Sequence, residues 1–255
     1  MTIAVTGAAS AVGDVVRDVF DEEERELYTQ REAPHVDGAA LDVTDESAFV
    51  EALDGTDTLL HLAWESASEG GWTSAHGENV RGTYNAFEAA RRNDLDRIVV
   101  ASTSHVVGMY NREDPGEMES LTEELSTVVG PEDPLRPDSY YGVAKAACEA
   151  IGSLYADRYG VDVVSLRLGW LMTEAELRAT RAGPAARHRF ARAMWLSPRD
   201  CRSLVSAAVR HALPTSPLVA NAISRNEDRY LTLAETVVAL DYQPRDDAAA
   251  VLAES

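Results

Sequence analysis

The alternation of short apolar runs with amphipathic segments constrains the fold of this chain more than any other feature. The run Ile3–Val5 precedes a helical segment, Ala11–Phe20. The continuous apolar run Thr58–Leu62 precedes a longer one, Thr73–Asn93, with apolar residues at helical spacing. Strands that alternate with helices in this way are typical of a parallel sheet, because parallel neighbours need crossover connections. The sequence therefore predicts an α/β fold with a doubly wound parallel sheet and helices on both faces.

The same pattern extends through most of the chain and then becomes irregular. Up to residue 170, the remaining predicted elements are strands at Glu26–Thr29, Ala39–Val43, Arg97–Ala101 and Val163–Leu168 and helices at Glu46–Leu53 and Ser139–Tyr159. Beyond it we predict helical segments at 174–192, Pro198–Ala212 and Leu231–Leu240 and a strand at Leu218–Ile223. The chain is therefore expected to divide into a core, residues 1–170, and a small lobe, residues 171–255, joined in one compact unit.

The charge of the chain narrows the choice of partners. The net charge is −20, and a surface this acidic repels nucleic acid and anionic membranes, so neither is expected as a partner. The cations are 22 arginines and a single lysine, Lys145. An acidic, lysine-poor surface suits a salt-rich, halophilic cytoplasm, where charge repulsion is screened. A GC-rich, acid-biased source is the alternative.

The sequence also indicates where the protein works. It has no apolar run long enough for a membrane span, and its N-terminus lacks the basic and long apolar segments of a signal peptide. The two cysteines, Cys148 and Cys201, stand alone, which argues against a disulfide framework and a zinc site. We therefore expect a cytoplasmic protein without a bound metal.

The stretch "TGAASAVG", residues 6–13, follows the first strand and opens the first helix. Gly7, Ala9 and Ser10 are small, as residues must be where backbone N–H groups approach a pyrophosphate. The Ser10 hydroxyl can cap the helix or donate to a phosphate oxygen. Only Gly7 and Gly13 stand where such loops usually have three glycines, so the stretch by itself fits a dinucleotide site or a tight turn.

The end of the second strand bears on the choice of cofactor. Dinucleotide-binding folds usually place an acid there to hold the adenosine ribose. In "LYTQREAP" that place is taken by Thr29 and Gln30, and Arg31 follows. Arg31 could bind the 2′-phosphate of NADP, which favours NADP slightly over NAD. A solvated loop arginine is the alternative.

The segment "SYYGVAKAACEA" places Tyr141 and Lys145 four residues apart, on one face of a predicted helix. A phenol has a pKa of about 10 and is a poor base at neutral pH, and an adjacent ammonium lowers that pKa by favouring the phenolate. The solitary lysine of the chain stands here, where a compact, rotatable ammonium is wanted. The pattern favours a tyrosine base with a lysine partner over a surface pair.

The strand before this helix ends in "ASTSHVVG". Small hydroxyl residues at the carboxyl end of a parallel strand face the ligand crevice, which makes Ser102 and Thr103 candidates. Capping of the strand end is the alternative. His105 is either a substrate contact or a polar residue satisfied within the fold. The acidic connection over residues 109–138 has a length that is often functional.

Together these motifs are similar to those of a known family. In order, "TGxxxxxG", "LDV", "LLHLA", "NVRGTYNAFEAA", "ASTSH", "YGVAK" and "LRLG" resemble the extended short-chain dehydrogenases, the NAD-dependent epimerase/dehydratase superfamily. "STSHVVGMY", "YGVAKAACEAIGSLY" and "AMWLSPRDC" resemble most closely the uronate dehydrogenases and the short-chain NAD-dependent glucose-6-phosphate and aldose 1-dehydrogenases. The resemblance implies a Rossmann-like fold and an oxidoreductase that oxidises C1 of a small sugar to a lactone with NAD(P)+.

The resemblance also implies roles for individual residues. It makes Tyr141 the catalytic base, Lys145 its partner and a ribose ligand, and Thr103 the counterpart of the relatives' catalytic serine. The implied cofactor-binding residues are Gly7, Ala9, Ser10, Ala11, Val12, Arg31, Asp42, Val43, Leu62, Ala63, Trp64, Asn79, Tyr141, Lys145 and Leu168, and the implied substrate-binding residues are Ser66, Ser104, His105, Trp170 and Arg192. In two departures, Ser10 replaces the middle glycine, which could weaken cofactor binding, and Thr29 replaces the ribose-binding acid.

The small lobe suits a small sugar rather than a nucleotide sugar. It holds seven arginines between residues 178 and 202, most of them expected to pair with the acidic remainder of the chain. One of them, Arg192 or Arg189, stands near the place where the relatives bind an anionic substrate. A neutral aldose, a uronate and a sugar phosphate are all compatible with these features.

Two other functions stay open at this point. One is a nucleotide-sugar epimerase or dehydratase that keeps NAD tightly bound, and the other is a non-catalytic NADP-binding regulator. The relatives commonly pair through the two long helices beside the active site, which implies a homodimer or a higher homo-oligomer.

Overall fold

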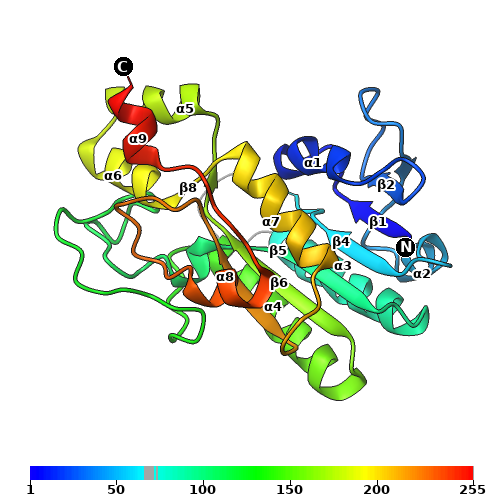
Figure 1. The fold of residues 1–255 in the computed structure, drawn as a ribbon. Coiled ribbons are helices and arrows are strands. Elements are labelled where there is room, and N and C mark those ends of the chain that lie inside the picture. The colour runs from blue at the N-terminus through cyan, green and yellow to red at the C-terminus, as the bar shows by residue number, and fades with distance from the viewer. Residues whose placement is uncertain (66–71, 73, 255) are drawn as a thin grey trace.

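A computed structural model of the chain describes residues 1–65, 72 and 74–254. Its central sheet has seven parallel strands in the order β3-β2-β1-β4-β5-β6-β9 (Figure 1). The strands are β1 (Ile3–Thr6), β2 (Arg25–Thr29), β3 (Ala39–Ala40), β4 (Thr58–His61), β5 (Arg97–Thr103), β6 (Asp162–Leu168) and β9 (Leu218–Ala222). The predicted Rossmann-like, doubly wound parallel sheet is confirmed.

The strand order reverses between β1 and β4, which are neighbours at the centre of the sheet. Both strands are fully buried, as central parallel strands are when helices cover both faces. Connections that leave such a reversal point run to opposite faces and open a crevice at the carboxyl ends of the strands. The loop after β1, residues 7–10, therefore lies at the edge of this crevice.

Two hydrophobic cores cover the two faces of the sheet. Consecutive strand residues alternate between them, so that Val5 packs in one core and Ala4 in the other. Figure 1 shows helices on both sides of the sheet. The helices of the first face are α1 (Ala11–Val16), α7 (Pro198–Arg210) and α8 (Ala234–Leu240), and those of the second are α2 (Glu46–Ala52), α3 (Ser74–Arg92) and α4 (Tyr140–Tyr159).

The chain leaves β6 at its carboxyl end and forms a small group of elements before it returns to the sheet as β9 (Figure 1). Leu177, Trp195 and Leu252 are buried in a third core within this group. Its elements are β7 (Trp170–Leu171), α5 (Glu174–Ala179), α6 (Ala185–Met194), β8 (Trp195–Leu196) and, after β9, α9 (Ala248–Ala253). Among the described residues, no helix has the length and apolar character needed to cross a lipid bilayer.

The structure corrects several predicted boundaries in the first half of the chain. The first helix ends at Val16 and continues as a 3₁₀ turn, η1 (Arg17–Val19). The strand predicted over 39–43 is limited to Ala39–Ala40, because the Asp42 carboxylate accepts from the N–H and hydroxyl of Thr44 and turns the chain. Local side-chain hydrogen bonds of this kind compete with a strand ladder.

Two helices of the second half also differ from the prediction. The helix predicted over 174–192 is divided into α5, a 3₁₀ turn η3 (Thr180–Ala182) and α6, because Pro184 lacks an N–H and stands at the N-cap of α6. The last predicted helix begins at Ala234 rather than Leu231, because Leu231 pairs with Val129 in an isolated β-bridge. The sequence did not predict α9.

Candidate active site

A cavity of about 340 Å³ opens at the carboxyl ends of β1, β2 and β4. Its wall consists of Gly7, Ala9, Ser10, Thr29, Gln30, Arg31, Glu32, Ala33, Ala63, Trp64 and Glu65. Six of these, namely Gly7, Ala9, Ser10, Arg31, Ala63 and Trp64, belong to the predicted cofactor set. The structure brings them together with Glu65, which the sequence did not single out.

The loop after β1 has a conformation that requires small residues. Gly7 has a φ of +71°, and a Cβ there would lie 2.6 Å from the backbone nitrogen of Ala63. The Ser10 hydroxyl oxygen caps α1 by accepting from the N–H of Gly13 at 3.0 Å, so its proton remains available to a ligand. A cradle with exposed backbone and no room for a Cβ fits the pyrophosphate of a dinucleotide.

Two contacts shape the opposite wall of the cavity. The Asn79 amide accepts from the backbone N–H of Glu65 and donates to the Glu65 carbonyl, both at 2.8 Å, and so holds the segment after β4. The Glu65 carboxylate reaches across to Arg31 at 3.3 Å. Because the Arg31 side chain is 83% exposed, this ion pair is weak and the guanidinium stands at the open edge of the cavity.

Tyr141, Lys145 and Thr103 meet beside this cavity. Tyr141 and Lys145 lie in the first turns of α4, and Thr103, the last residue of β5, is close enough to Tyr141 to lower the pKa of its hydroxyl. The Lys145 ammonium donates to the Ala101 carbonyl at 2.5 Å and lies 3.7 Å from the centre of the Trp64 ring. Through Trp64 the three predicted catalytic residues adjoin the predicted cofactor site.

Burial dominates the protonation of this group. It lowers the pKa of Lys145 to about 8, against the opposing effects of Cys148 and Glu149. Burial also raises the pKa of Tyr141, and Thr103 opposes that increase. Without a bound ligand, the cost of burying the charged forms of Lys145 and Tyr141 therefore exceeds the stabilisation that neighbouring groups give to those charges.

The lowering of the Tyr141 pKa by Lys145, expected from the sequence, is not found in the structure. The ammonium lies 6.0 Å from the centre of the Tyr141 ring and is engaged by Ala101 instead. Thr103 is the group that stabilises the phenolate here. The spacing in the sequence correctly places both residues on one helix face, but it does not show where the ammonium points.

Buried hydrogen bonds set the position of α4 against the sheet. Ser139 caps the helix by accepting from the N–H of Gly142 at 3.1 Å. One turn beyond Lys145, the Glu149 carboxylate accepts from the Ser102 hydroxyl at 2.6 Å and pairs with Arg167 of β6 at 2.9 Å. These contacts fix the rotation of α4, so that Tyr141 faces the end of β5.

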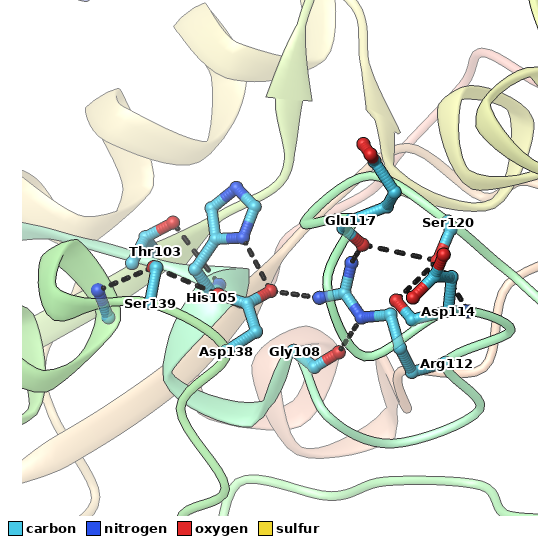
Figure 2. Close-up of polar contacts among 10 residues, drawn as sticks. Thr103, His105, Gly108, Arg112, Asp114, Glu117, Ser120, Asp138 and Ser139 are labelled. Atoms are coloured by element: carbon cyan, nitrogen blue, oxygen red, sulfur yellow. Dashed lines mark hydrogen bonds and ion pairs between the residues drawn. The ribbon is translucent and has the colours of Figure 1, made fainter. Parts of the chain in front are cut away.

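A group of aromatic rings forms the other side of the catalytic residues. The His105 ring lies 5.9 Å from the Tyr141 ring and stacks on Phe190 of α6 at 6.0 Å. Trp170 of β7 lies 6.0 Å from Phe190. The His105 Nδ1 is 2.8 Å from the Asp138 carboxylate, and Figure 2 draws this contact. We refer to this group beside Tyr141 as the sugar side, because the resemblance predicts that His105 and Trp170 bind the sugar.

The comparison with known families decides what the cavity and the catalytic residues belong to. A model described as "NAD dependent epimerase/dehydratase family" matches residues 3–195. The chain belongs to this family. The matched range contains the loop after β1, Asn79, Thr103, Tyr141 and Lys145, so the observed geometry and the family membership rest on the same residues.

Three relatives within this family are similar over nearly the whole chain. L-arabinose 1-dehydrogenase (NAD(P)(+)) of Haloferax volcanii is 47% identical over 98% of this chain and 98% of its own. NAD-dependent glucose-6-phosphate dehydrogenase of the same organism is 31% identical over 97% and 94%. A solved mutant of uronate dehydrogenase from Agrobacterium tumefaciens, complexed with NAD, has a TM-score of 0.78 and 25% identity over 99% and 89%. The predicted resemblance to sugar 1-dehydrogenases is confirmed.

The other predicted cofactor residues of this family member are not in the wall of the cavity. Ala11 and Val12 form the first turn of α1, Leu62 follows β4, Leu168 ends β6, Val43 is buried, and Asp42 is exposed and bonded to Thr44. Among the predicted substrate residues, Ser104 is buried in η2 (Ser104–Val107) beside His105. Ser66 lies outside the described residues.

The structure does not bring Arg192 to the sugar side. Arg192 and Phe190 are two residues apart on α6 and therefore face different directions. Phe190 faces His105. The three arginines of α6 are all engaged by carboxylates: Arg187 pairs with Glu119, Arg189 with Glu113, and Arg192 with Asp228.

Sequence reasoning missed Glu65, Arg112, Asp138 and Phe190. Asp138 had a local signal, because it directly precedes the helix cap Ser139 and the pair Tyr141 and Lys145. Glu65 also had one, because it directly follows Ala63 and Trp64 of the predicted cofactor set. Arg112 and Phe190 had none, since they meet the site through contacts distant in the sequence. In the part of the chain that the structure describes, no group of three His, Cys, Asp or Glu side chains could hold a metal ion.

Proposed function

We propose that this protein is an NAD(P)-dependent sugar 1-dehydrogenase that oxidises C1 of a small neutral aldose to a lactone. The observation that carries this proposal is the grouping of Thr103, Tyr141 and Lys145 beside a cavity that fits a dinucleotide. The relative that is 47% identical is named for oxidation of a sugar at this position. The relatives named as glucose-6-phosphate and uronate dehydrogenases support the same type of reaction.

In the proposed reaction the C1 hydroxyl of the sugar lies between Tyr141 and Thr103. The Tyr141 phenolate takes the hydroxyl proton, and Thr103 donates a hydrogen bond to the reacting oxygen. When bound, the nicotinamide accepts the hydride that leaves C1. The sugar thus loses one proton and one hydride and becomes a lactone. Lys145 would bind the cofactor ribose and add positive charge near the phenolate.

The sugar side favours a neutral aldose over a uronate or a sugar phosphate. The three arginines of α6 are paired with carboxylates, so an anionic substrate would have to displace Glu119, Glu113 or Asp228 to bind one of them. Phe190 and Trp170 instead offer aromatic surface beside Tyr141 and His105. We propose that the elements after residue 170, as the small lobe, set the choice of sugar in this way.

The cofactor side favours use of both NADP+ and NAD+, with NADP+ slightly preferred. Thr29 and Gln30, rather than a carboxylate, stand at the tip of β2, so the acid that usually binds the ribose is missing there, while Glu32 and Glu65 lie elsewhere in the cavity wall. Arg31 at the cavity edge can pair with the 2′-phosphate of NADP+. The 47% identical relative is named for both cofactors.

A cofactor-reduction assay tests the proposed function. The protein is incubated with L-arabinose, a uronate or glucose 6-phosphate, each with NAD+ and NADP+, at high and low salt. We expect NAD(P)H formation with the neutral aldose. Tyr141→Phe should lower kcat by a factor of about 10²–10⁴ while NADPH binding is kept.

Other outcomes of the assay would contradict the proposal. Tightly retained NAD without net reduction would indicate an epimerase or a dehydratase. Binding of NADPH with no turnover of any sugar would indicate a regulator. A rate near that of the wild type for Tyr141→Phe would show that another group is the base.

We also propose that the protein works as a homodimer in a salt-rich cytoplasm. Tyr84 of α3 and Val143 and Leu154 of α4 are large, exposed apolar residues on the two long helices, and apolar surface of this kind favours association. The charge of −20 needs screening by salt. Sedimentation velocity in molar salt should show a dimer that Leu154→Glu converts to a monomer; a wild-type monomer would contradict the proposal.

A further inference from the structure

The side chain of His105 is held by a buried carboxylate. Its Nδ1 lies 2.8 Å from Oδ2 of Asp138, which also forms an ion pair with Arg112. The Asp138 and Arg112 side chains are 1% and 3% exposed. The other carboxylate oxygen accepts from the Ser139 hydroxyl at 3.0 Å. Asp138 is therefore surrounded by donors and cannot rotate without losing several hydrogen bonds (Figure 2).

Hydrogen bonds hold the Arg112 guanidinium in place, and the guanidinium in turn holds the Asp138 carboxylate. Its Nε donates to the Gly108 carbonyl at 2.9 Å and its Nη1 donates to the Glu117 carbonyl at 2.6 Å. The space between these groups is fully used, because a Cβ at Gly108 would lie 1.9 Å from Oδ2 of Asp138. The long connection over residues 109–138 thus folds back to place one guanidinium behind one carboxylate.

This arrangement determines which nitrogen of His105 carries the proton. A carboxylate paired with arginine only accepts hydrogen bonds, so Nδ1 of a neutral His105 must carry the proton and Nε2 the lone pair. Among the residues that the structure describes, none is hydrogen-bonded to Nε2. Figure 2 shows this nitrogen pointing away from Asp138, and the ring lies between those of Tyr141 and Phe190.

We propose that Asp138 and Arg112 are positioning residues that lock His105 in the Nδ1–H form, so that Nε2 accepts a hydrogen bond from a sugar hydroxyl beside C1. The inference rests on the proposed function for the identity of the substrate, but the proton position on His105 does not depend on it. The lock makes a hydroxyl at that place a requirement, because a sugar without it leaves Nε2 unpaired.

Long-range ¹H–¹⁵N NMR spectra of the whole protein test the proton position directly. They are recorded at about pH 8, above the ordinary imidazole pKa of about 6.5, and the His105 signals are identified by their loss in His105→Asn. We expect the Nδ1–H form in the wild type and loss of this preference in Asp138→Leu, which has no acceptor for the Nδ1 proton; Asp138→Asn would be uninformative, because Nδ1 and Arg112 share the same oxygen, Oδ2. An Nε2–H wild type, or an unchanged variant, would overturn the proposal.

A second buried carboxylate provides the matched control. Asp200 is fully buried and accepts from the backbone N–H groups of Arg245 and Asp246 at 2.9 and 3.0 Å, away from the catalytic residues. Asp200→Leu should lower stability and leave the form of His105 unchanged. A change of the His105 form in this control as well would show that the spectra report general loosening, and would count against the proposal.

Steady-state kinetics test the positioning role. Asp138→Leu should raise the KM for the aldose by a factor of about 10–100, with a smaller change in kcat and an unchanged Kd for NADPH. In a His105→Asn background, Asp138→Leu should change KM by less than twofold, because the residue through which it acts is gone. A full effect in that background would refute the proposal.

A double substitution keeps the test possible if the single variant is too unstable to fold. If Asp138→Leu does not fold, Arg112→Gln with Asp138→Leu removes both charges, so no single charge is left buried. The same change of the His105 form and the same rise in KM are expected. If the wild type oxidises no sugar at all, the proposed function fails, and the NMR result still decides the proton position.

Discussion

The predicted cofactor side of the active site is shaped mainly by backbone contacts, and the predicted sugar side mainly by contacts between side chains. On the cofactor side the backbone does most of the shaping: Gly7 lies against the backbone of Ala63, and Asn79 binds the backbone of Glu65. On the sugar side, side chains from distant segments meet, as with His105 and Asp138. A change on the cofactor side should therefore affect all sugars alike, whereas a change on the sugar side should alter one sugar relative to another.

The largest effect is expected at Lys145, which stands between the two sides. Lys145→Met should lower kcat/KM by a factor of about 10²–10⁴ for every sugar, because the ammonium near the phenolate and the ribose is lost. The variant should nevertheless be more stable than the wild type near neutral pH, because burial of the ammonium disfavours the charged form.

The pH dependence of stability gives this prediction its sign. Folding lowers the pKa of Lys145 from 10.5 to about 8, so between these values the unfolded chain binds more protons and wild-type stability rises with pH. The advantage of Lys145→Met should therefore narrow mainly between about pH 8 and pH 10.5, by roughly 3 kcal/mol at about 1.4 kcal/mol per pKa unit. Urea unfolding of both proteins measures it, and an advantage that widens with pH would contradict the assignment.

The next effect tests the backbone cradle. Gly7→Ala places a Cβ 2.6 Å from the Ala63 nitrogen at a φ of +71°, and should raise the Kd for NADPH by a factor of about 100, because the loop must shift and an L-residue is strained there by about 1–2 kcal/mol. Gly55→Ala is the control, since Gly55 has a φ of +75° with nothing within 4 Å of the added Cβ. Fluorescence titration with NADPH should find a raised Kd for Gly7→Ala and an unchanged Kd for Gly55→Ala. An equal rise in both variants would mean that backbone strain, and not contact with Ala63, weakens binding.

A smaller and more selective effect is expected on the sugar side. Phe190→Leu removes the ring that stacks on His105 at 6.0 Å and should lower kcat/KM for L-arabinose about tenfold, the value of about 1.4 kcal/mol of lost aromatic contact. The Kd for NADPH should stay unchanged. If cofactor binding weakens equally, the separation between the two sides is wrong.

The smallest effect is expected at the exposed edge of the cofactor cavity. Arg31→Ala should lower the ratio of kcat/KM for NADP+ over NAD+ by about threefold to tenfold, because an exposed charge pair is worth only about 1 kcal/mol. Glu65→Gln should raise the same ratio, since it releases Arg31 from its partner. Initial rates with both cofactors measure this ratio. If both variants change the ratio in the same direction, Glu65 and the 2′-phosphate do not compete for Arg31.

The difference between the two sides also explains what could be predicted from the sequence. Gly7, Tyr141 and Lys145 act within a loop or along one helix, so their spacing is sufficient to place them. His105 and Asp138 are 33 residues apart, and their contact depends on the path of the connection between them, which no local pattern describes.

The helix predicted over 174–192 shows the same limit in a second way. The arginine-rich composition indicated a cation for the substrate, and helical spacing separates Arg192 from Phe190. Spacing alone does not show which side of the helix meets the active site. That depends on the break at Pro184, which ends one helical segment and starts α6 in a new direction.

The solitary lysine has a practical consequence for the study of this protein. Since Lys145 carries the chain's one ε-amine, amine-directed labelling can mark only this group and the N-terminus. Reductive methylation with ¹³C-formaldehyde would therefore yield at most two resonances, and the one from Lys145, which is 5% exposed, would report on the predicted cofactor site. Dyes and supports are too large to reach a buried ε-amine, so coupling through amines would be directed at the N-terminus and away from this site.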